Sequence, residues 1–458
     1  MSKTLLIKNR TNLETSELRR KALDIIEAGI SRVLPGTIMR TALSFEPRTG
    51  RLRVNDDFHQ VKGRLFVIGG GKASGLMAQA LERIIGPETI TAGIIVEKAN
   101  PTEFSTRIVK MVQAGHPIPD SRGVAAVQDM LRLKQRFLIT GEDIVLCLLS
   151  GGASALMPSP VGGVSLREKQ EVTRLLLACG ADIYEINTVR KHLSRIKGGR
   201  LAQYFAPARV ISLILSDVVG NDLSVIASGP TCPDPSTYAD ACTVLQKYRL
   251  TGKAPEGVVS VLEQGCKGVI PETPKWLDNV NNYIIGYNRM ALAAMAQKAR
   301  DAGFNPLIIS SEQTGDTEAV ARRRAQEILA GTYEGYNALI IGGETTPALP
   351  PDPGKGGRNQ HYAALTALLL AGYPGEWVMA SVGTDGSDFI PEVAGAIVDQ
   401  ETRQTISNKK LDYKAMIARF DSNTLLAGVG NSLVITGSTG TNVGDIMVYL
   451  LQPAIREK

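Results

Sequence analysis

Short, almost uninterrupted runs of apolar residues recur along the chain, and each is followed at once by Gly, Ser, Asp or Thr. The runs occupy residues 65–68, 144–149, 210–215, 338–341, 377–382 and 432–435. Strands that helices cover on both faces have such sequences, and helical patterns lie between several of the runs. We therefore predict an α/β fold of mainly parallel sheets flanked by helices. In such folds, ligands bind outside the carboxyl ends of the strands, which is where each polar turn lies.

The chain is long enough for two domains, because its 458 residues exceed the size at which one hydrophobic core stops growing. Near the start, residues 15–34 have the spacing of an amphipathic helix. Between residues 230 and 282 the chain is rich in proline, weakly periodic and without a glycine-rich strand end. We predict an N-terminal Rossmann-like α/β domain over 1–240, a connecting segment over 241–281 and a C-terminal α/β domain over 282–458.

Charge and cysteine content limit the partners and the compartment. The net charge of +6 is mild and scattered, so we expect a small anionic partner and no nucleic acid. No apolar run approaches the roughly 20 residues of a membrane span, and the first residues lack a signal-peptide segment, so we expect no membrane partner. The 5 cysteines form no CxxC pair, which favours a reducing compartment, the cytoplasm. The sequence is compatible with a homodimer.

The first candidate for an anion site is the turn GGGKAS. A buried strand, glycines and a following helix would expose the backbone of Gly70 and Gly71 beside the ammonium group of Lys72. The turn is not a Walker A motif, because Ala73 follows Lys72, and Ser74 stands where a GxGxxG motif needs its last glycine. The alternative is a tight turn with a solvated lysine.

A second turn of this kind comprises Ser150, Gly151, Gly152, Ala153 and Ser154. Small residues after a buried strand let the backbone approach a phosphate closely, so we predict that this turn binds a phosphate group. A serine nucleophile is poorly supported, because the GxSxG pattern of a nucleophile elbow is absent.

Two aspartates at strand ends are candidates for holding Mg²⁺. Asp217 and Asp385 each come just after a buried run. A carboxylate beside a phosphate-binding turn is well placed to hold Mg²⁺, often through water. Asn221, in the turn after Asp217, is a candidate for nucleotide binding, whereas Asp222 is equally compatible with capping a helix.

The second half carries a long loop rich in proline and glycine, PALPPDPGKGGRNQ, before a helix expected over 360–370. Its Lys355 and Arg358 are cations near the start of that helix. A mobile loop that delivers a guanidinium group suits charge neutralisation during phosphoryl transfer. Asp388 and Asp445 lie in further polar turns. Phosphoryl transfer depends mainly on positioning and electrostatic stabilisation, for which these residue types are suited.

A basic segment at residues 187–202 leaves two interpretations open. Its cations are Arg190, Lys191, Arg195, Lys197 and Arg200. One interpretation is an ordinary solvated helix, and the other is a basic rim that attracts a polyanionic nucleotide.

The motifs taken together resemble those of the MOFRL-type glycerate 2-kinases, some of which are also labelled hydroxypyruvate reductases. The similar motifs are GGGKAS (69–74), GHPIPD (115–120), LLSGGASALMPSP (148–160), VRKHLSRIKGGRLA (189–202), LSDVVGNDLSVIASGPTCPDPST (215–237), GGET (342–345), GGRNQ (356–360), GTDGSD (383–388), AGAIVD (394–399) and TGSTGTNVGD (436–445). They occur in order from about residue 15 to about residue 450, which makes chance similarity implausible.

The resemblance implies two α/β domains, the second of them MOFRL-like, with the active site in the cleft between them. It implies transfer of the γ-phosphoryl group of ATP to the 2-hydroxyl of D-glycerate, with Mg²⁺. By the same resemblance, Lys72 and Arg358 are the catalytic cations and the turn at 150–154 belongs to the nucleotide phosphate site. Asp217 and Asp385 are implied to be the acidic groups near metal and substrate.

The sequence departs from the family pattern after GTDGSD. Phe389 to Val393 stand where the family usually has a Gly-Pro-Thr-Asp-Ala-like run, and Ser438 replaces an expected proline. A longer sugar acid therefore stays open as the substrate. Two other classes also stay open: a nicotinamide-dependent hydroxypyruvate reductase, which the missing GxGxxG motif disfavours, and a ligand sensor without catalysis.

Overall fold

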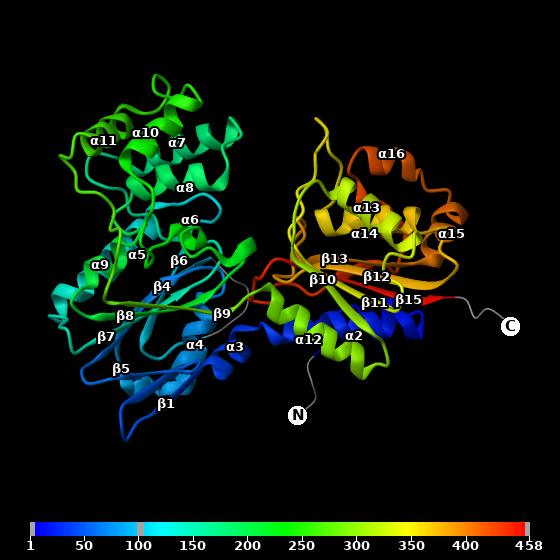
Figure 1. Cartoon of the computed structure of the whole chain (residues 1–458), viewed down its shortest axis with the longest axis horizontal. Coiled ribbons are helices and arrows are strands. Elements are labelled where there is room, and N and C mark those ends of the chain that lie inside the picture. Colours follow the sequence, from blue (N-terminus) through cyan, green and yellow to red (C-terminus); the bar gives the residue numbers. More distant parts are fainter. Residues whose placement is uncertain (1–4, 99–104, 454–458) are drawn as a thin grey trace. The chain divides into compact units, whose positions relative to one another are not determined.

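The computed structural model describes residues 5–98 and 105–453. The chain divides into two compact units, residues 38–285, here called the central unit, and residues up to 37 together with those from 286 onward, here called the terminal unit. Each unit contains a 6-stranded sheet with helices packed on it (Figure 1). The α/β class is confirmed. The division differs from the expected domains 1–240, 241–281 and 282–458 at both the start of the chain and the connecting segment.

The sheet of the central unit is parallel from β6 to β8. Its strand order is β6 (Val109–Ala114), β5 (Ile90–Lys98), β4 (Leu65–Gly70), β7 (Ile144–Leu149), β8 (Arg209–Leu215) and β9 (Val280–Gly286). The helices next to it are α4 (Ser74–Ile85), α5 (Ser121–Arg136), α6 (Ala153–Leu156) and α9 (Arg200–Phe205), with short 3-10 turns at Pro87–Thr89, Val219–Asn221 and Ile226–Ser228. Every residue of β4 and β7 is buried, as their apolar sequences predict.

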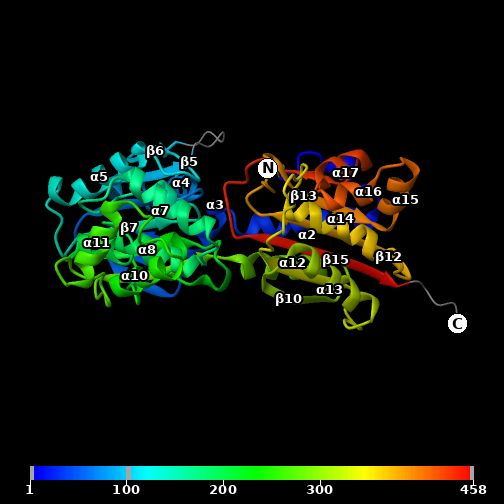
Figure 2. The same cartoon turned by 90° about the horizontal axis from the view of Figure 1, so that it is seen from above.

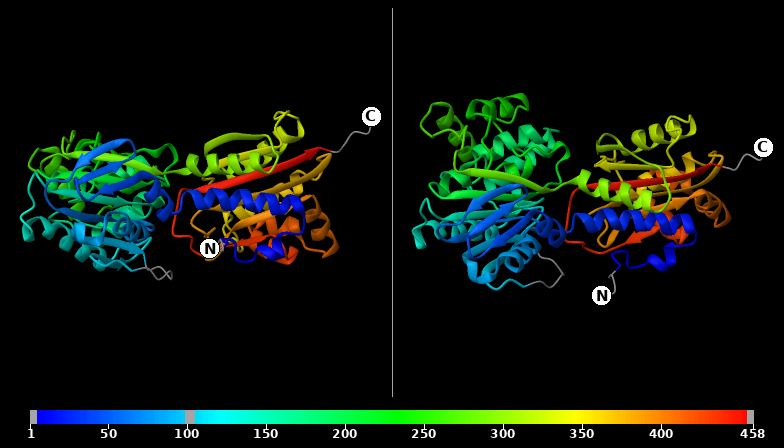
Figure 3. Two further views of the ribbon diagram at one scale, coloured as in Figure 1. Left: turned by 90° about the horizontal axis from the view of Figure 1, so that it is seen from below. Right: turned by 60° about the horizontal axis from the view of Figure 1, so that its bottom comes forward.

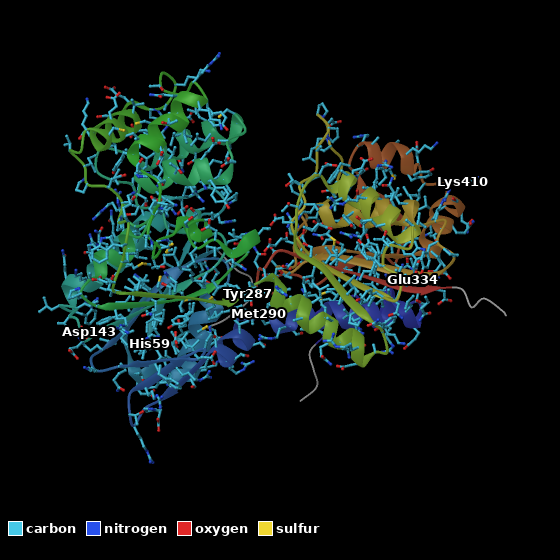
Figure 4. All side chains as sticks on the ribbon, viewed as in Figure 1. His59, Asp143, Tyr287, Met290, Glu334 and Lys410 are labelled. Atoms are coloured by element: carbon cyan, nitrogen blue, oxygen red, sulfur yellow. The ribbon has the colours of Figure 1, made fainter. Side chains whose placement is uncertain are left out.

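A small antiparallel sheet adjoins this parallel one. It consists of β1 (Leu43–Glu46), β2 (Arg51–Val54) and β3 (Asp57–Gln60). The imidazole Nε2 of His59 lies 2.9 Å from the hydroxyl of Tyr283 on β9, which connects the two sheets. His59 and Asp143, which precedes β7 and pairs with Arg64, are labelled in Figure 4. His59 and Asp143 therefore contribute to packing within the central unit through their contacts with Tyr283 and Arg64.

The segment expected to connect two domains is folded into the central unit. It forms α10 (Tyr238–Lys247) and α11 (Glu256–Cys266), which pack with α7 (Leu166–Ala178) and α8 (Ile183–His192) around a shared apolar core. Figure 1 shows these helices gathered at the top of the unit. Gly265 allows the close approach, since a methyl group on it would lie 2.2 Å from the ring of Tyr238. Short helices separated by prolines gave the segment its weak periodicity.

The sheet of the terminal unit is mixed, whereas the sequence predicted a mainly parallel one. Its order is β10 (Pro306–Gln313), β11 (Ala338–Gly343), β15 (Asp445–Pro453), β12 (Gly375–Gly383), β13 (Val393–Asp399) and β14 (Leu433–Ile435). Among the strand pairs described in this sheet, only β10 and β11 run parallel. The short link from Gly383 at the end of β12 to Val393 at the start of β13 leaves no room for the crossover connection that a parallel neighbour needs. The sequence does not reveal this, because a buried strand has a continuous apolar sequence whether its neighbours run parallel or antiparallel to it.

Helices cover both faces of this mixed sheet. On one face lie α2 (Glu17–Arg32) and α12 (Asn288–Asp301), which contact one another and β15 (Figure 3). On the other lie α13 (Thr317–Leu329), α14 (Arg358–Leu369), α15 (Gln400–Asn408), α16 (Tyr413–Ala418) and α17 (Ser422–Val429), seen from above in Figure 2. The remaining helices are α1 (Arg10–Leu13) and α3 (Pro35–Ala42). None of the helices in the described part of the chain has the length and apolar character needed to cross a bilayer.

The amphipathic helix predicted near the start of the chain is α2, and it belongs to the terminal unit. Gly29 brings it close to its neighbours: a methyl group there would lie 2.8 Å from Met295 Cγ and 3.0 Å from Ile446 Cδ1. The guanidinium group of Arg19 is buried against Asp399 at 2.5 Å and also donates to the carbonyl of Asn431 at 2.6 Å. These long-range contacts explain why the start of the chain folds with its end.

We expect Arg19→Met to lower the free energy of unfolding by about 3–5 kcal/mol, because it leaves the carboxylate of Asp399 buried without its partner. Denaturant titration of the purified variants measures the loss. The matched control is Arg20→Met, whose ion pair with Glu17 is exposed, with side chains 45% and 62% accessible. That variant should lose less than about 1 kcal/mol. Equal losses in the two variants would contradict the assigned packing of α2.

Candidate active site

The strand ends of the central unit meet at one edge of the sheet. Gly70 at the end of β4 pairs with Leu149 at the end of β7, and Leu149 pairs with Ile214 near the end of β8. Because the strands are parallel, the turns that follow them lie side by side. The structure thus brings the GGGKAS turn, the 150–154 turn and Asp217 together.

Hydrogen bonds hold the first two turns against one another. The backbone N–H of Lys72 donates to the carbonyl of Gly151 at 2.9 Å, and the N–H of Ala73 donates to Ser150 Oγ at 3.0 Å. Ser150 Oγ also lies 3.1 Å from Ser74 Oγ. The hydroxyl of Ser150 is therefore engaged in fixing the geometry of the two turns.

Glycines at these turns allow contacts that a side chain would prevent. A methyl group on Gly151 would lie 1.9 Å from Asp217 Oδ2, so the carboxylate of Asp217 sits directly against this backbone. One on Gly71 would lie 2.1 Å from Ser150 Oγ. Asn221 follows in a partly buried 3-10 turn with φ of 56°.

Two consecutive backbone N–H groups remain available at this edge. Within the described part of the chain, the N–H groups of Gly151 and Gly152 have no hydrogen-bond acceptor. Gly152 has φ of 83°, in the left-handed region that favours glycine. Successive N–H groups in such a turn form a concave donor site for an anion.

His116, for which the sequence favours a structural loop residue, lies at the same edge. A methyl group on Gly152 would lie 2.9 Å from His116 Nε2 and 3.3 Å from Lys72 Cγ, so the imidazole and the lysine side chain flank this glycine. Burial, with added repulsion from Lys72 and Lys98, lowers the pKa of His116 to about 4, so the ring is neutral at pH 7. The available signal was its position just after β6, at another strand end.

In the terminal unit, the first residue of β15 lies between the carboxyl ends of β11 and β12. Asp445, the first residue of β15, pairs with Gly343 at the end of β11 and with Gly383 at the end of β12. β15 runs antiparallel to both neighbours, so its start lies at their carboxyl ends. This register places the GGET, GTDGSD and TGSTGTNVGD motifs at one edge of the sheet.

The guanidinium group of Arg358 is firmly held at this edge. Its Nε and Nη2 donate to the buried carboxylate of Asp445 at 2.6 and 3.0 Å, and its Nη1 lies 2.9 Å from Glu344 Oε1. Burial alone would lower the pKa of Arg358, but the two carboxylates outweigh it and raise that pKa. Arg358 is the first residue of α14 rather than part of a mobile loop, which differs from the prediction.

Asp388 fixes the start of α14. Its carboxylate accepts hydrogen bonds from the backbone and side-chain amides of Asn359 and Gln360, at 2.9 to 3.2 Å. Burial, and next the charge of Asp445, raise the pKa of Asp388 to about 6. This cap positions Arg358, a role that the sequence reasoning did not assign to Asp388.

The carboxylates proposed for metal binding lie in different units. Asp217 belongs to the central unit and Asp385 to the terminal unit. A methyl group on Gly383 would lie 3.5 Å from an oxygen of both Asp385 and Asp445, so these two carboxylates are neighbours. Among the residues described, no group of three His, Cys, Asp or Glu side chains could hold a metal ion. Mg²⁺ commonly takes only one or two protein carboxylates and completes its shell with phosphate and water, which these residues fit.

The departure at 389–393 forms a turn whose aromatic ring faces solvent. Phe389 is 86% exposed, and Phe389 and Glu392 have φ of 66° and 70°. The carbonyl of Glu392 accepts hydrogen bonds from the N–H groups of Thr436 and Gly437, both at 3.2 Å. The turn is thereby attached to the TGSTGTNVGD motif.

Two family models match the chain. Residues 21–263 match a domain of unknown function designated DUF4147, and residues 337–445 match the MOFRL family. The two matches fall mainly on the central and terminal units respectively.

Relatives of known name match almost the whole chain. A glycerate 2-kinase from Pyrococcus horikoshii is 36% identical, over 94% of this chain and 98% of the relative. The crystal structure of a glycerate kinase from Thermotoga maritima is 35% identical with a TM-score of 0.82, covering 94% of this chain and 99% of that one. A protein from Agrobacterium vitis named provisionally as a hydroxypyruvate reductase is 37% identical, over 87% of this chain and 90% of its own.

Proposed function

We propose that this chain transfers the γ-phosphoryl group of ATP to the 2-hydroxyl of D-glycerate. The chain belongs to the glycerate kinase family that carries a MOFRL domain. The products would be 2-phosphoglycerate and ADP. Phosphoryl transfer depends on donors and cations placed around the moving group rather than on covalent chemistry by the protein.

The observation that carries the proposal is the edge of the central unit. Lys72, the N–H groups of Gly151 and Gly152, and Asp217 converge there. We assign the backbone donors and the lysine to the nucleotide phosphates, as for other anions held by glycine-rich turns. We assign Asp217 to Mg²⁺ on those phosphates. Gly70, Gly71, Ser150, Ala153 and Ser154 shape or line the turns, and Asn221 belongs to the same nucleotide site in this proposal.

We assign the edge of the terminal unit to the same reaction. Arg358, held by Asp445 and Glu344, would stabilise the negative charge that spreads over the equatorial oxygens. Asp385 would orient the acceptor hydroxyl or a water on Mg²⁺. The pairing with two carboxylates fixes the guanidinium group in place before substrate arrives, which lowers the entropic cost of positioning.

Product analysis tests the proposal directly. The purified protein is incubated with ATP, Mg²⁺ and a panel of three- and four-carbon hydroxy-acids, and release of ADP is followed. Phosphorus NMR then identifies the phosphorylated position. D-glycerate should be converted to the 2-phosphate, and faster turnover of a longer sugar acid would shift the substrate assignment. Oxidation of NADH with hydroxypyruvate, without ADP release, would replace the kinase by a reductase. A cytoplasmic location and a homodimer stay predictions.

We expect Gly152→Ala to raise the KM for ATP by about tenfold, because the added methyl group meets His116 and disturbs the adjacent N–H donors. Gly163→Ala is a matched control: φ is 85° there, close to that of Gly152, and the nearest atom to the methyl group is 3.5 Å away. Both variants bear a similar backbone strain of about 1 kcal/mol. Steady-state kinetics should separate them, and equal KM values would argue against the assigned donors.

A further inference from the structure

The basic segment at 187–202 is largely buried, so the interpretation of it as a solvated helix is wrong. Arg195 is exposed, Lys191 pairs with the buried Asp234 at 3.2 Å, and Arg200 donates to the carbonyls of Ser194 and Pro271. These cations are accounted for. Arg190 and Lys197 are the exceptions, since neither pairs with a carboxylate in the described part of the chain.

Lys197 begins a chain of hydrogen bonds with a fixed direction. Its ammonium group is buried and donates to Ser154 Oγ at 2.9 Å and to the carbonyl of Ala227 at 3.3 Å. Ser154 Oγ lies 2.8 Å from Ser228 Oγ, which donates to Asn187 Oδ1 at 2.9 Å. Because the proton of Ser228 goes to Asn187, the hydroxyl of Ser154 donates to Ser228.

This direction uses the side-chain oxygen of Asn187 and leaves two groups on α8 without acceptors. Asn187 Nδ2 is buried, in a residue only 3% exposed, and has no partner. The guanidinium group of Arg190, three residues further on α8 and so on the same helix face, makes no hydrogen bond or ion pair with any described residue. A buried donor without an acceptor is costly, so a ligand that supplies oxygen atoms would be favoured here.

Electrostatics favour an anion in the same place. Burial, together with repulsion from Lys169 and Arg190, lowers the pKa of Lys197 well below its usual range. Lys169 is itself buried, with a pKa lowered to about 7, and donates to the carbonyl of Leu193 at 3.0 Å. Cations without counter-ions repel one another, and a negative ligand among them removes that repulsion.

We infer that Asn187, Arg190 and Lys197, aligned through Ser154, bind the carboxylate group of the hydroxy-acid substrate. The inference rests on the proposed function. Ser154 is the second residue of α6, directly after the Gly151 and Gly152 donors, so an acid held here would present its hydroxyl near the phosphate held there. Ser228, whose φ of 60° lies in the left-handed region, contributes its hydroxyl to this series of hydrogen bonds.

A carboxylate fits these groups better than a nucleotide phosphate does. ATP arrives with Mg²⁺, which needs oxygen ligands from the protein or water, whereas this group of side chains offers mainly donors and no carboxylate. A planar monoanion matches the fork of a guanidinium group and one primary amide.

The test uses the full chain and three variants. Lys197→Met removes the ammonium group with little change in volume. Asn187→Asp replaces the unpartnered donor by a carboxylate that would neutralise Lys197, so it should keep or raise the thermal unfolding temperature while repelling the acid. Arg195→Met is the control, since it removes an exposed cation of the same segment. For each protein, the KM values for D-glycerate and ATP are measured, and binding of D-glycerate without ATP is measured by calorimetry.

We expect Lys197→Met and Asn187→Asp to raise the KM for D-glycerate and its calorimetric Kd by about tenfold to a hundredfold, with the KM for ATP changed by less than about twofold. Arg195→Met should match the wild type. An increase in the KM for ATP instead, or no change in either constant, would overturn the inference. Calorimetry separates this result from the proposed function: binding of D-glycerate that is lost in both variants supports the carboxylate site even when no ADP is released.

Discussion

Replacing Arg358 by Met should lower kcat by about 10³-fold or more and also destabilise the terminal unit by about 3 kcal/mol. The first effect follows from loss of the guanidinium group assigned to the transferring phosphoryl group. The second follows from the structure, because the carboxylate of Asp445 is fully buried and would lose its bidentate partner. Steady-state kinetics and denaturant unfolding measure the two effects on the same protein sample.

A double variant separates the two effects. Arg358→Met combined with Asp445→Asn removes the uncompensated charge, so stability should return to within about 1 kcal/mol of the wild type while activity stays lost. Return of activity together with stability would mean that Arg358 acts only on folding. In that case its catalytic assignment would be withdrawn.

The strand-end turns could be predicted because their signals are local. A buried parallel strand needs a continuous run of apolar residues. The turn that follows the strand must be polar when that turn faces a ligand. The apolar run and the polar turn can both be recognised from a few consecutive residues, as at Ile144–Leu149 and the glycines that follow. The parallel order of the central sheet then brought Lys72 and Asp217 to one edge without further information.

Strand direction and domain membership depend on contacts that no local pattern records. β15 is the last strand in sequence but lies between β11 and β12, and only this insertion places Asp445 against Arg358. The amphipathic spacing of α2 identified a helix and the face it buries. It could not identify the partner of that face, which is set by α12 and β15, hundreds of residues away.

The burial of charged side chains was the other feature that could not be predicted from the sequence. A helical segment with several cations is usually solvated, and periodicity alone does not distinguish a buried lysine from an exposed one. Lys197 is 2% exposed because α8 and the turns around Ser154 and Ser228 enclose it. The position of His116 beside Gly152 is equally beyond a local pattern, because this contact joins residues from two separate strand ends.

Replacing Lys72 by Met should lower kcat by about 10²–10³-fold, the usual cost of removing one donor or charge from a developing oxyanion. The backbone N–H of Lys72 still donates to Gly151, so the turn and the thermal stability should be retained. The variant has a second readout that does not involve catalysis. The ammonium group of Lys72 helps to hold the pKa of His116 near 4, although burial contributes more.

Loss of that charge should raise the pKa of His116 while leaving it below 6.5, because the ring stays buried. NMR titration is practical, since the chain has only 4 histidines. Lys98→Met is the matched control: Lys98 is exposed and acts on His116 more weakly, so this variant should raise the pKa slightly and leave kcat unchanged. A raised pKa with unchanged kcat in Lys72→Met would place the lysine beside His116 but outside the reaction. An unchanged pKa would contradict the geometry of the turn itself, and with it the convergence of strand ends on which the assignment of a kinase site depends.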